Sequence, residues 1–255
     1  MAPERRNPKR PFHPRSHQPP PGLWLYGLHA VRAALENPAR KVHRLVLTER
    51  GVEELGKKAV GRVRHEIASM DAIGKLLPPG AVHQGVALNC DKLSARSLED
   101  VLPEKTGKRR VVLILDQITD PHNAGAILRS AAAFGVDAVV VQDRHAPPES
   151  GVLAKAASGA LDVVPIATVV NIARTLELLG EAEFWRVALA GDGDQPLREA
   201  VSGGDVALVL GSEGSGVRRL VRERCDTSAT IPISGQAESL NVSNAAAVAL
   251  YEVRR

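Results

Sequence analysis

Short apolar runs alternate with helix-like segments from residue 110 onward. The runs are rich in β-branched residues and lie at 111–115, 138–142, 163–167, 185–191, 206–211 and 229–233. Such runs are typical of strands that are buried on both faces of a sheet. Their alternation with helices predicts an α/β fold built on a parallel sheet, with ligands bound beyond the carboxyl ends of the strands.

A smaller α/β unit precedes this region. We predict helices over 26–37, where Asn37-Pro38 ends the pattern, and over 53–66, and strands over 43–49 and 83–90. The polar stretch that follows has no strong strand, so we place the domain junction there. The predicted organisation is a tail over 1–20, an N-terminal domain over 21–91, a linker over 92–109 and a C-terminal domain over 110–255.

Residues 1–20 are basic and rich in proline, and they contain almost nothing that a core could bury. Such a segment cannot offset the entropy lost on ordering, so we predict a disordered tail. Two roles stay open for it. It is either an arm that binds RNA phosphates through its charge or a solvated tail without a role.

The composition limits which classes of protein and which kinds of site are possible. The 255-residue chain has a net charge of +4, which permits a polyanionic partner without requiring one. Cys90 and Cys225 cannot form a disulfide framework, and no Cys-x-x-Cys or HExxH pattern offers a metal site. The sequence has no signal-peptide stretch and no run approaching the roughly 20 apolar residues of a membrane span. We therefore expect a cytoplasmic protein without a metal or a membrane segment.

The loop after the strand at 111–115 reads DQITDPHNAGAILRS. Asn123 lies near a predicted helix start, where its amide either caps backbone N–H groups or contacts a ligand. Arg129 follows among apolar neighbours, so its charge is either solvated or directed at an anion. Taken alone, this loop is explained as well by capping and solvation as by chemistry.

The loop after the run at 206–211 reads GSEGSGV. It lacks the lysine of a Walker phosphate loop and the spacing of a GxGxxG fingerprint. The carboxylate of Glu213 would also repel phosphates. A carboxylate among glycines suits a neutral or cationic ligand, such as a sulfonium cofactor that carries an adenosine. A simple tight turn is the alternative.

A third polar corner lies in the segment IPISGQAESLNVSNAAAVALYEV. A short strand over 231–233 is predicted to lead into Ser239 and Asn241, which are both good helix caps. The helix after them has one apolar stripe. Capping explains the two polar residues, whereas Ile231 and Leu240 offer apolar cover for an adenine ring.

Together these motifs resemble those of a known family. DPHNAGAILRSA, LVLGSEGSGV and IPISGQAESLNVSNAAAVAL, in this order and spacing, are similar to the three motifs of the SpoU (TrmH) family of SPOUT methyltransferases. YGLHAVRAAL and VHQGVAL resemble the ribosomal-protein-like substrate-binding domain of family members that methylate a guanosine of 23S rRNA. The resemblance covers most of the chain except the tail and the junction.

The resemblance implies a SPOUT domain with a C-terminal trefoil knot, S-adenosylmethionine as cofactor, and a homodimer with its sites near the subunit interface. By motif, the polar active-site residues are Asn123, Arg129, Glu213, Ser239 and Asn241. The cofactor-binding positions are Gly211, Ile231 and Leu240, with Ala190 and Gly191 in the least distinctive loop of the match.

The implied reaction moves a methyl group to a ribose 2′-hydroxyl of RNA, with 23S rRNA or a ribosome-assembly intermediate as the partner. A guanidinium is a poor base, so we expect Arg129 to hold a neighbouring phosphate and to stabilise the developing alkoxide. Asn123 and Asn241 would orient the ribose and the RNA backbone, while Glu213 and Ser239 would hold the loops or the cofactor. The alternatives are a tRNA substrate and a catalytically inert RNA-binding assembly factor. A nicotinamide dehydrogenase is disfavoured by the broken glycine fingerprints.

Overall fold

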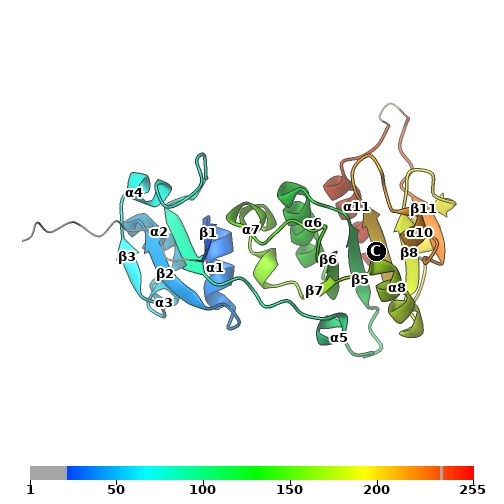
Figure 1. Ribbon diagram of the computed structural model, residues 1–255, viewed down its shortest axis with the longest axis horizontal. Coiled ribbons are helices and arrows are strands. Elements are labelled where there is room, and N and C mark those ends of the chain that lie inside the picture. Colours follow the sequence, from blue (N-terminus) through cyan, green and yellow to red (C-terminus); the bar gives the residue numbers. More distant parts are fainter. Residues whose placement is uncertain (1–21, 236–237) are drawn as a thin grey trace, which may run out of the picture.

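The computed structural model describes residues 22–235 and 238–255, so the tail predicted over 1–20 lies outside the described residues. Two lobes lie side by side, and the segment between β4 (Val86–Cys90) and α5 (Leu98–Val101) joins them along one edge of the molecule (Figure 1). Within the described ranges, no helix combines the length and the apolar character needed to cross a membrane.

The N-terminal lobe is built on a sheet with the strand order β1-β4-β2-β3 among the described residues. Strand β2 pairs parallel with β3 and antiparallel with β4, which pairs antiparallel with β1. Its remaining elements are β1 (Leu23–Tyr26), α1 (Leu28–Glu36), β2 (Val42–Leu47), α2 (Glu49–Leu55), α3 (Lys57–Val60), β3 (His65–Ile67) and α4 (Met70–Gly74).

The helix predicted over 53–66 is wrong in its extent. Gly56, with a φ of 90°, ends α2, and a separate turn of helix follows. The chain then enters β3, whose backbone pairs with β2. The sequence pattern did not reveal β3 because all three of its side chains are exposed.

The C-terminal lobe contains a parallel sheet, which confirms the predicted α/β fold. Among the described residues its strand order is β7-β6-β5-β10-β8-β11-β9, and every pairing is parallel. The strands are β5 (Val111–Asp116), β6 (Ala138–Gln142), β7 (Ile166–Val169), β8 (Trp185–Leu189), β9 (Gln195–Pro196), β10 (Val206–Gly211) and β11 (Thr227–Thr230). The trefoil knot stays a prediction.

Side chains along β5 alternate between the two faces of this sheet, as strand geometry requires. Leu113 packs in one hydrophobic cluster and Ile114 in another, and both are fully buried. The first cluster includes α6 (Pro121–Ala133), α7 (Gly151–Ala157), the 3₁₀ turn η1 (Ala160–Asp162), α9 (Leu197–Ala200) and α11 (Val242–Arg254). The second includes α5, α8 (Ile172–Glu181) and α10 (Arg219–Arg222).

Two element boundaries near the motifs decide how the predicted site residues are placed. Helix α6 begins at Pro121, because Asp120 caps it by accepting from the backbone N–H of His122 at 3.0 Å and proline suits the first helical turn. Asn123 therefore lies inside the first turn and is not the cap. Strand β11 ends at Thr230, so the strand predicted over 231–233 is wrong, and those residues form a loop instead.

The two lobes share one hydrophobic core, because buried residues of α1, β2 and β4 belong to the same cluster as those of α6 and α7. Helix α7 approaches β1 so closely that a Cβ on Gly151 would lie 2.4 Å from the Tyr26 ring. Between the lobes, the side chain of Arg40 is fully buried. Its Nε donates to Asp162 Oδ1 at 2.8 Å, and its Nη1 donates to Glu149. The N-terminal lobe is thus packed firmly against the C-terminal one.

Candidate active site

The loops after β8, β10 and β11 converge on a cleft of about 820 Å³ at the carboxyl ends of these strands. Parallel α/β sheets bind their ligands at this edge, and small-molecule sites have volumes of roughly 300–1,000 Å³. The cleft brings together most of the predicted site residues: Ala190, Gly191, Gly211, Glu213, Ile231, Ser239, Leu240 and Asn241.

Asn241 links the three sequence motifs. Its Nδ2 donates to Glu213 Oε1 at 2.6 Å and to Asn123 Oδ1 at 3.0 Å. Its Oδ1 accepts from the backbone N–H of Ser243 at 2.9 Å and thereby caps α11. Every polar atom of this amide is therefore used within the protein. Asn123 is thus connected to the cleft through Asn241 although it does not line the cleft.

The glycine-rich loop after β10 folds back over the end of its own strand. Ser212 and Gly216 form a β-bridge, and Gly214 and Gly216 adopt φ values of 84° and 66°. A Cβ on Gly211 would lie 2.0 Å from the carbonyl carbon of Gly216, so only glycine fits there. The glycines serve a compact turn that leaves Glu213 facing the cleft.

An ion pair with a buried carboxylate, which the sequence pattern did not indicate, anchors the end of this loop. The carboxylate of Asp116, at the end of β5, is fully buried. It accepts from Arg218 Nε at 2.8 Å and from the Arg218 backbone N–H at 3.0 Å. The available signal was an aspartate that ends an otherwise apolar strand, since a buried charge needs a partner.

A second arginine holds the loop after β8. Arg222 Nη1 donates to Asp192 Oδ1 at 2.9 Å, and Nη2 donates to Ser228 Oγ at 2.9 Å. Hydrogen bonding from Arg222, together with its positive charge, keeps the pKa of Asp192 below its usual range. This interaction fixes the loop that places Ala190 and Gly191 on the wall of the cleft.

The charge of the cleft suits a cationic ligand. Its lining includes the carboxylates of Glu213 and Glu238 and, among the described residues, no Lys or Arg. S-adenosylmethionine carries a sulfonium and an ammonium group against one carboxylate. The apolar lining, which includes Leu189, Leu210 and Ile231, offers cover for a purine. The residues present therefore fit this cofactor better than they fit a nucleotide phosphate.

Arg129 lies apart from the other predicted site residues. It follows Asn123 by six residues, which corresponds to about 9 Å along a helix. Its side chain lines a different hollow, between the lobes, together with His29 and Arg32. Within one chain, the structure does not bring Arg129 into the cleft. In the part of the chain that the structure describes, no three His, Cys, Asp or Glu side chains gather as a metal site.

Known proteins share this architecture. Residues 110–251 match the family model described as the SpoU rRNA Methylase family. The chain belongs to the SpoU rRNA methylase family. Residues 24–95 match a second model, described as RNA 2′-O ribose methyltransferase substrate binding. The family resemblance read from the three motifs is thereby confirmed.

Individual relatives are similar to this chain in sequence and in structure. The 23S rRNA (guanosine-2′-O-)-methyltransferase RlmB of Yersinia pestis is 39% identical over 245 residues, covering 91% of this chain and 96% of that protein. The AdoMet-bound rRNA methyltransferase from Sinorhizobium meliloti has a TM-score of 0.74 at 25% identity, covering 91% of this chain and 87% of that one. The A. aeolicus TrmH/SpoU tRNA modifying enzyme has a TM-score of 0.52 at 28% identity, covering 58% of this chain and 75% of that one.

Proposed function

We propose that this protein transfers a methyl group from S-adenosylmethionine to the 2′-hydroxyl of a guanosine in 23S rRNA. The observation that carries the proposal is the hydrogen-bonded link from Asn123 through Asn241 to Glu213, which joins the three family motifs at one acidic, partly apolar cleft. The similar 23S rRNA methyltransferases come from bacteria, in which ribosomal RNA is made and processed in the cytoplasm, and we propose the same location for this protein.

The extent of the similarities favours rRNA over tRNA. Relatives named for 23S rRNA match 91% of this chain, which must include the N-terminal lobe. The similarity to the tRNA modifying enzyme covers only 58%. An inert RNA-binding factor is the less favoured alternative, because it would have no need of the linked polar residues in the cleft.

S-adenosylmethionine supplies a methyl group on a sulfonium sulfur that is already activated. The ribose hydroxyl is a poor nucleophile at neutral pH, so the protein must position it and stabilise the charge that develops on its oxygen. Since the Asn241 amide is fully committed, we infer that it orients Asn123 instead of contacting RNA. Asn123 Nδ2 has no partner among the described residues and is free to donate to an RNA oxygen.

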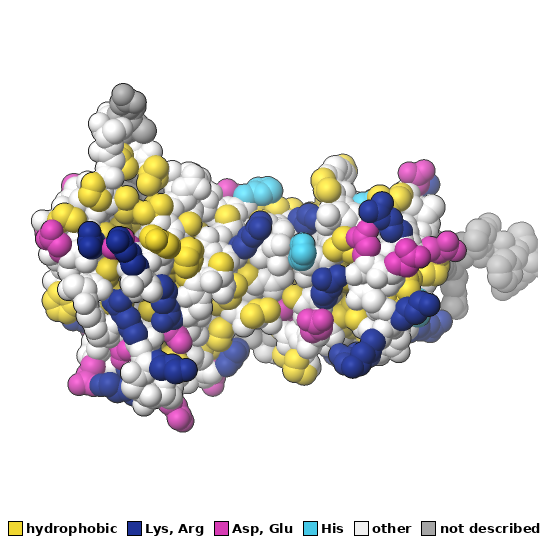
Figure 2. Space-filling view, turned by 180° about the vertical axis from the view of Figure 1, so that it is seen from behind, with side chains coloured by type: hydrophobic (Ala, Val, Ile, Leu, Met, Phe, Trp, Pro, Cys, Tyr) yellow, Lys and Arg dark blue, Asp and Glu magenta, His cyan; other side chains and the backbone are white. Residues whose placement is uncertain are grey.

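We further propose that the active form is a homodimer in which Arg129 of one copy serves the cleft of the other. Arg129 does not line the cleft of its own chain. Apolar side chains are exposed on α11 beside the cleft, where Val248 is 45% and Tyr251 57% accessible. Ile233 and Leu240 add to this surface, and Figure 2 shows hydrophobic side chains gathered at the base of the loop that carries them. A clustered apolar surface of this kind is typical of an interface.

A transfer assay tests the reaction and the substrate. Purified protein, labelled S-adenosylmethionine and transcripts of 23S rRNA or tRNA are incubated, and the RNA is digested to nucleosides. We expect label in 2′-O-methylguanosine from 23S rRNA. Label on a base would contradict the proposed reaction, and preferential labelling of tRNA would contradict the proposed substrate.

Mixing two inactive variants tests the shared site. Arg129→Ala should lose transfer but retain cofactor binding, and Arg129→Lys should rescue poorly because it lacks the planar fork. Asn241→Asp keeps Arg129 but should impair the cleft, because it replaces the amide that donates to Glu213. Co-refolding the two variants should restore transfer, because one site of each mixed dimer then combines an intact cleft with an intact arginine. If each chain used its own Arg129, the mixture would stay inactive.

A further inference from the structure

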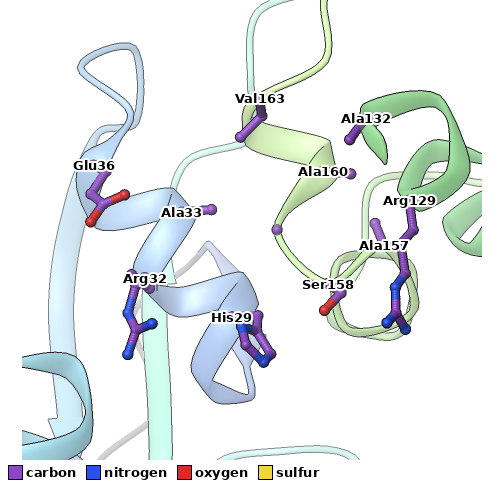
Figure 3. Close-up of a pocket in the computed structure, with 11 residues that line it drawn as sticks. His29, Arg32, Ala33, Glu36, Arg129, Ala132, Ala157, Ser158, Ala160 and Val163 are labelled. Atoms are coloured by element: carbon purple, nitrogen blue, oxygen red, sulfur yellow. The ribbon is translucent and has the colours of Figure 1, made fainter. Parts of the chain in front are cut away.

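A second hollow, of about 250 Å³, lies between the two lobes. Helix α1 contributes His29 and Arg32, α6 contributes Arg129, and the end of α7 contributes Ser158. In Figure 3 the side chains of these residues point toward the same side of the hollow, with the Ser158 hydroxyl between the two lobes' cations. The opposite end is closed by Ala132 and Val163.

The positive charges of this hollow are not neutralised by ion pairs. No carboxylate among the described residues lies within salt-bridge distance of Arg32 or Arg129, although ion pairs hold many other arginines of the chain. Arg32 donates instead to the backbone carbonyl of Glu54. Glu36 is the acidic residue of the lining, and Figure 3 shows it at some distance from Arg129 and Ser158.

Lys155 adds a further cation at the same seam. It lies on α7, and its Nζ donates to the Gln84 side chain of the opposite lobe. Burial lowers the pKa of Lys155, and no carboxylate of the described residues pairs with it. Figure 2 shows Lys, Arg and His side chains where the two lobes meet.

The two walls of the hollow are held in a fixed relation. Asp162, at the end of η1, accepts from Arg40 Nε at 2.8 Å and from Asn37 Nδ2 at 3.0 Å. On the wall itself, a Cβ on Gly159 would lie 3.0 Å from the carbonyl oxygen of His29. Arg32 of α1 therefore faces Arg129 of α6 across a seam that does not depend on ligand binding to form.

We propose that this interlobe hollow, lined by His29, Arg32 and Arg129 and with Lys155 at the same seam between the lobes, binds backbone phosphates of the substrate RNA beside the target nucleotide. The proposal rests on the proposed function. The donors of the hollow suit phosphate oxygens, and no Phe, Tyr or Trp among the described residues lines it to stack a base. Arg129 is assigned to the reacting ribose, and His29 and Arg32 line the same hollow. A phosphate that these two residues hold therefore belongs to the same RNA strand as that ribose. The N-terminal lobe thus helps to set which nucleotide reaches the cleft.

The salt dependence of RNA binding tests this proposal. The affinity for a 23S rRNA fragment is measured at several salt concentrations for the wild type, Arg32→Gln and Lys75→Gln. Lys75 is an exposed cation of the same lobe, at the end of α4 and remote from the hollow. We expect Arg32→Gln to weaken binding several-fold and to reduce the slope of log affinity against log salt by about 0.7–0.9, the value of one phosphate contact. Lys75→Gln should match the wild type.

Lys155→Gln provides a second test, in case Arg32→Gln loses its contact with α2 and folds poorly. It should reduce the slope in the same way, while its calorimetric affinity for S-adenosylmethionine stays that of the wild type. Weaker binding with an unchanged slope, or unchanged binding in both variants, would overturn the hollow as a phosphate site. Neither result contradicts the proposed function, which is contradicted only if the wild type transfers no methyl group to RNA.

Discussion

Asn241 combines two roles in one side chain: its oxygen caps α11, and its nitrogen connects the other two motifs. The sequence predicted the cap and the membership of the site, because Asn is a preferred N-cap and the motif was recognisable. It did not predict the connection, since Asn123 lies 118 residues away and only the folded sheet brings the two together.

We predict that Asn241→Asp separates these two roles. An aspartate oxygen still caps the helix, but the two donors are lost and a second carboxylate faces Glu213. Methyl transfer should fall by about 10- to 100-fold, since a hydrogen bond to a charged group contributes about 1.5–3 kcal/mol and a like-charge contact replaces it. Asn171→Asp is the matched control, because Asn171 also caps a helix, α8, and does not line the cleft. Equal transfer rates for the two variants would contradict this role for Asn241.

The two thiols should be unreactive in the folded protein. Burial raises the pKa of Cys90 to about 11 and that of Cys225 to about 12. The reactive thiolate is therefore almost absent at pH 8. We expect no iodoacetamide adduct at either residue in native protein and two adducts in denaturant, as measured by mass spectrometry. Rapid labelling of native protein would show that one thiol is not enclosed as described.

At the scale of elements, the strands of the C-terminal lobe were predictable because burial on both faces makes them continuous apolar runs. The N-terminal part of α6 was not predictable in this way, because the hydrophobic pattern around Asp120 and Pro121 is that of a loop. Strand β9 comprises two residues and has no pattern to detect. The ends of strands and helices carry the site, and they are also the parts that pattern predicts least well.

The turn after β10 gives a prediction at this scale. Gly211→Ala would place a Cβ 2.0 Å from the carbonyl carbon of Gly216, so the loop must move. We expect a loss of about 1–3 kcal/mol in unfolding free energy, measured by denaturant titration. The matched control is Gly203→Ala, just before the same strand, where a Cβ would meet nothing within 4 Å. If both variants were equally stable, the proposed close packing of the loop would be wrong.

At the scale of the whole molecule, the sequence indicated two units but not how they meet. Arg40 and Asp162 are 122 residues apart, and neither stands out in the sequence as one half of a buried pair. Their contact, with the shared hydrophobic core, makes the two lobes one body. This arrangement places Arg32 of α1 and Arg129 of α6 at the same hollow.

We therefore predict that Arg40→Ala loosens the lobes. Breaking a buried pair by removing one partner costs about 3–5 kcal/mol, because the other charge stays buried. Thermal unfolding should begin earlier, and small-angle scattering should show a larger radius of gyration. Arg44→Ala is the control, since Arg44 forms a more exposed pair with Glu66 that is worth about 1 kcal/mol or less. An unchanged radius and stability in Arg40→Ala would contradict a rigid interlobe contact.

We expect the loops after β8, β10 and β11 to form the binding site for the methyl donor. Calorimetric titration of S-adenosylmethionine into the wild type and into Gly211→Ala tests it most directly. We predict one site per chain in the wild type and an affinity at least about tenfold lower in the variant. Absence of binding heat in the folded wild type, or undiminished affinity in the variant, would contradict it.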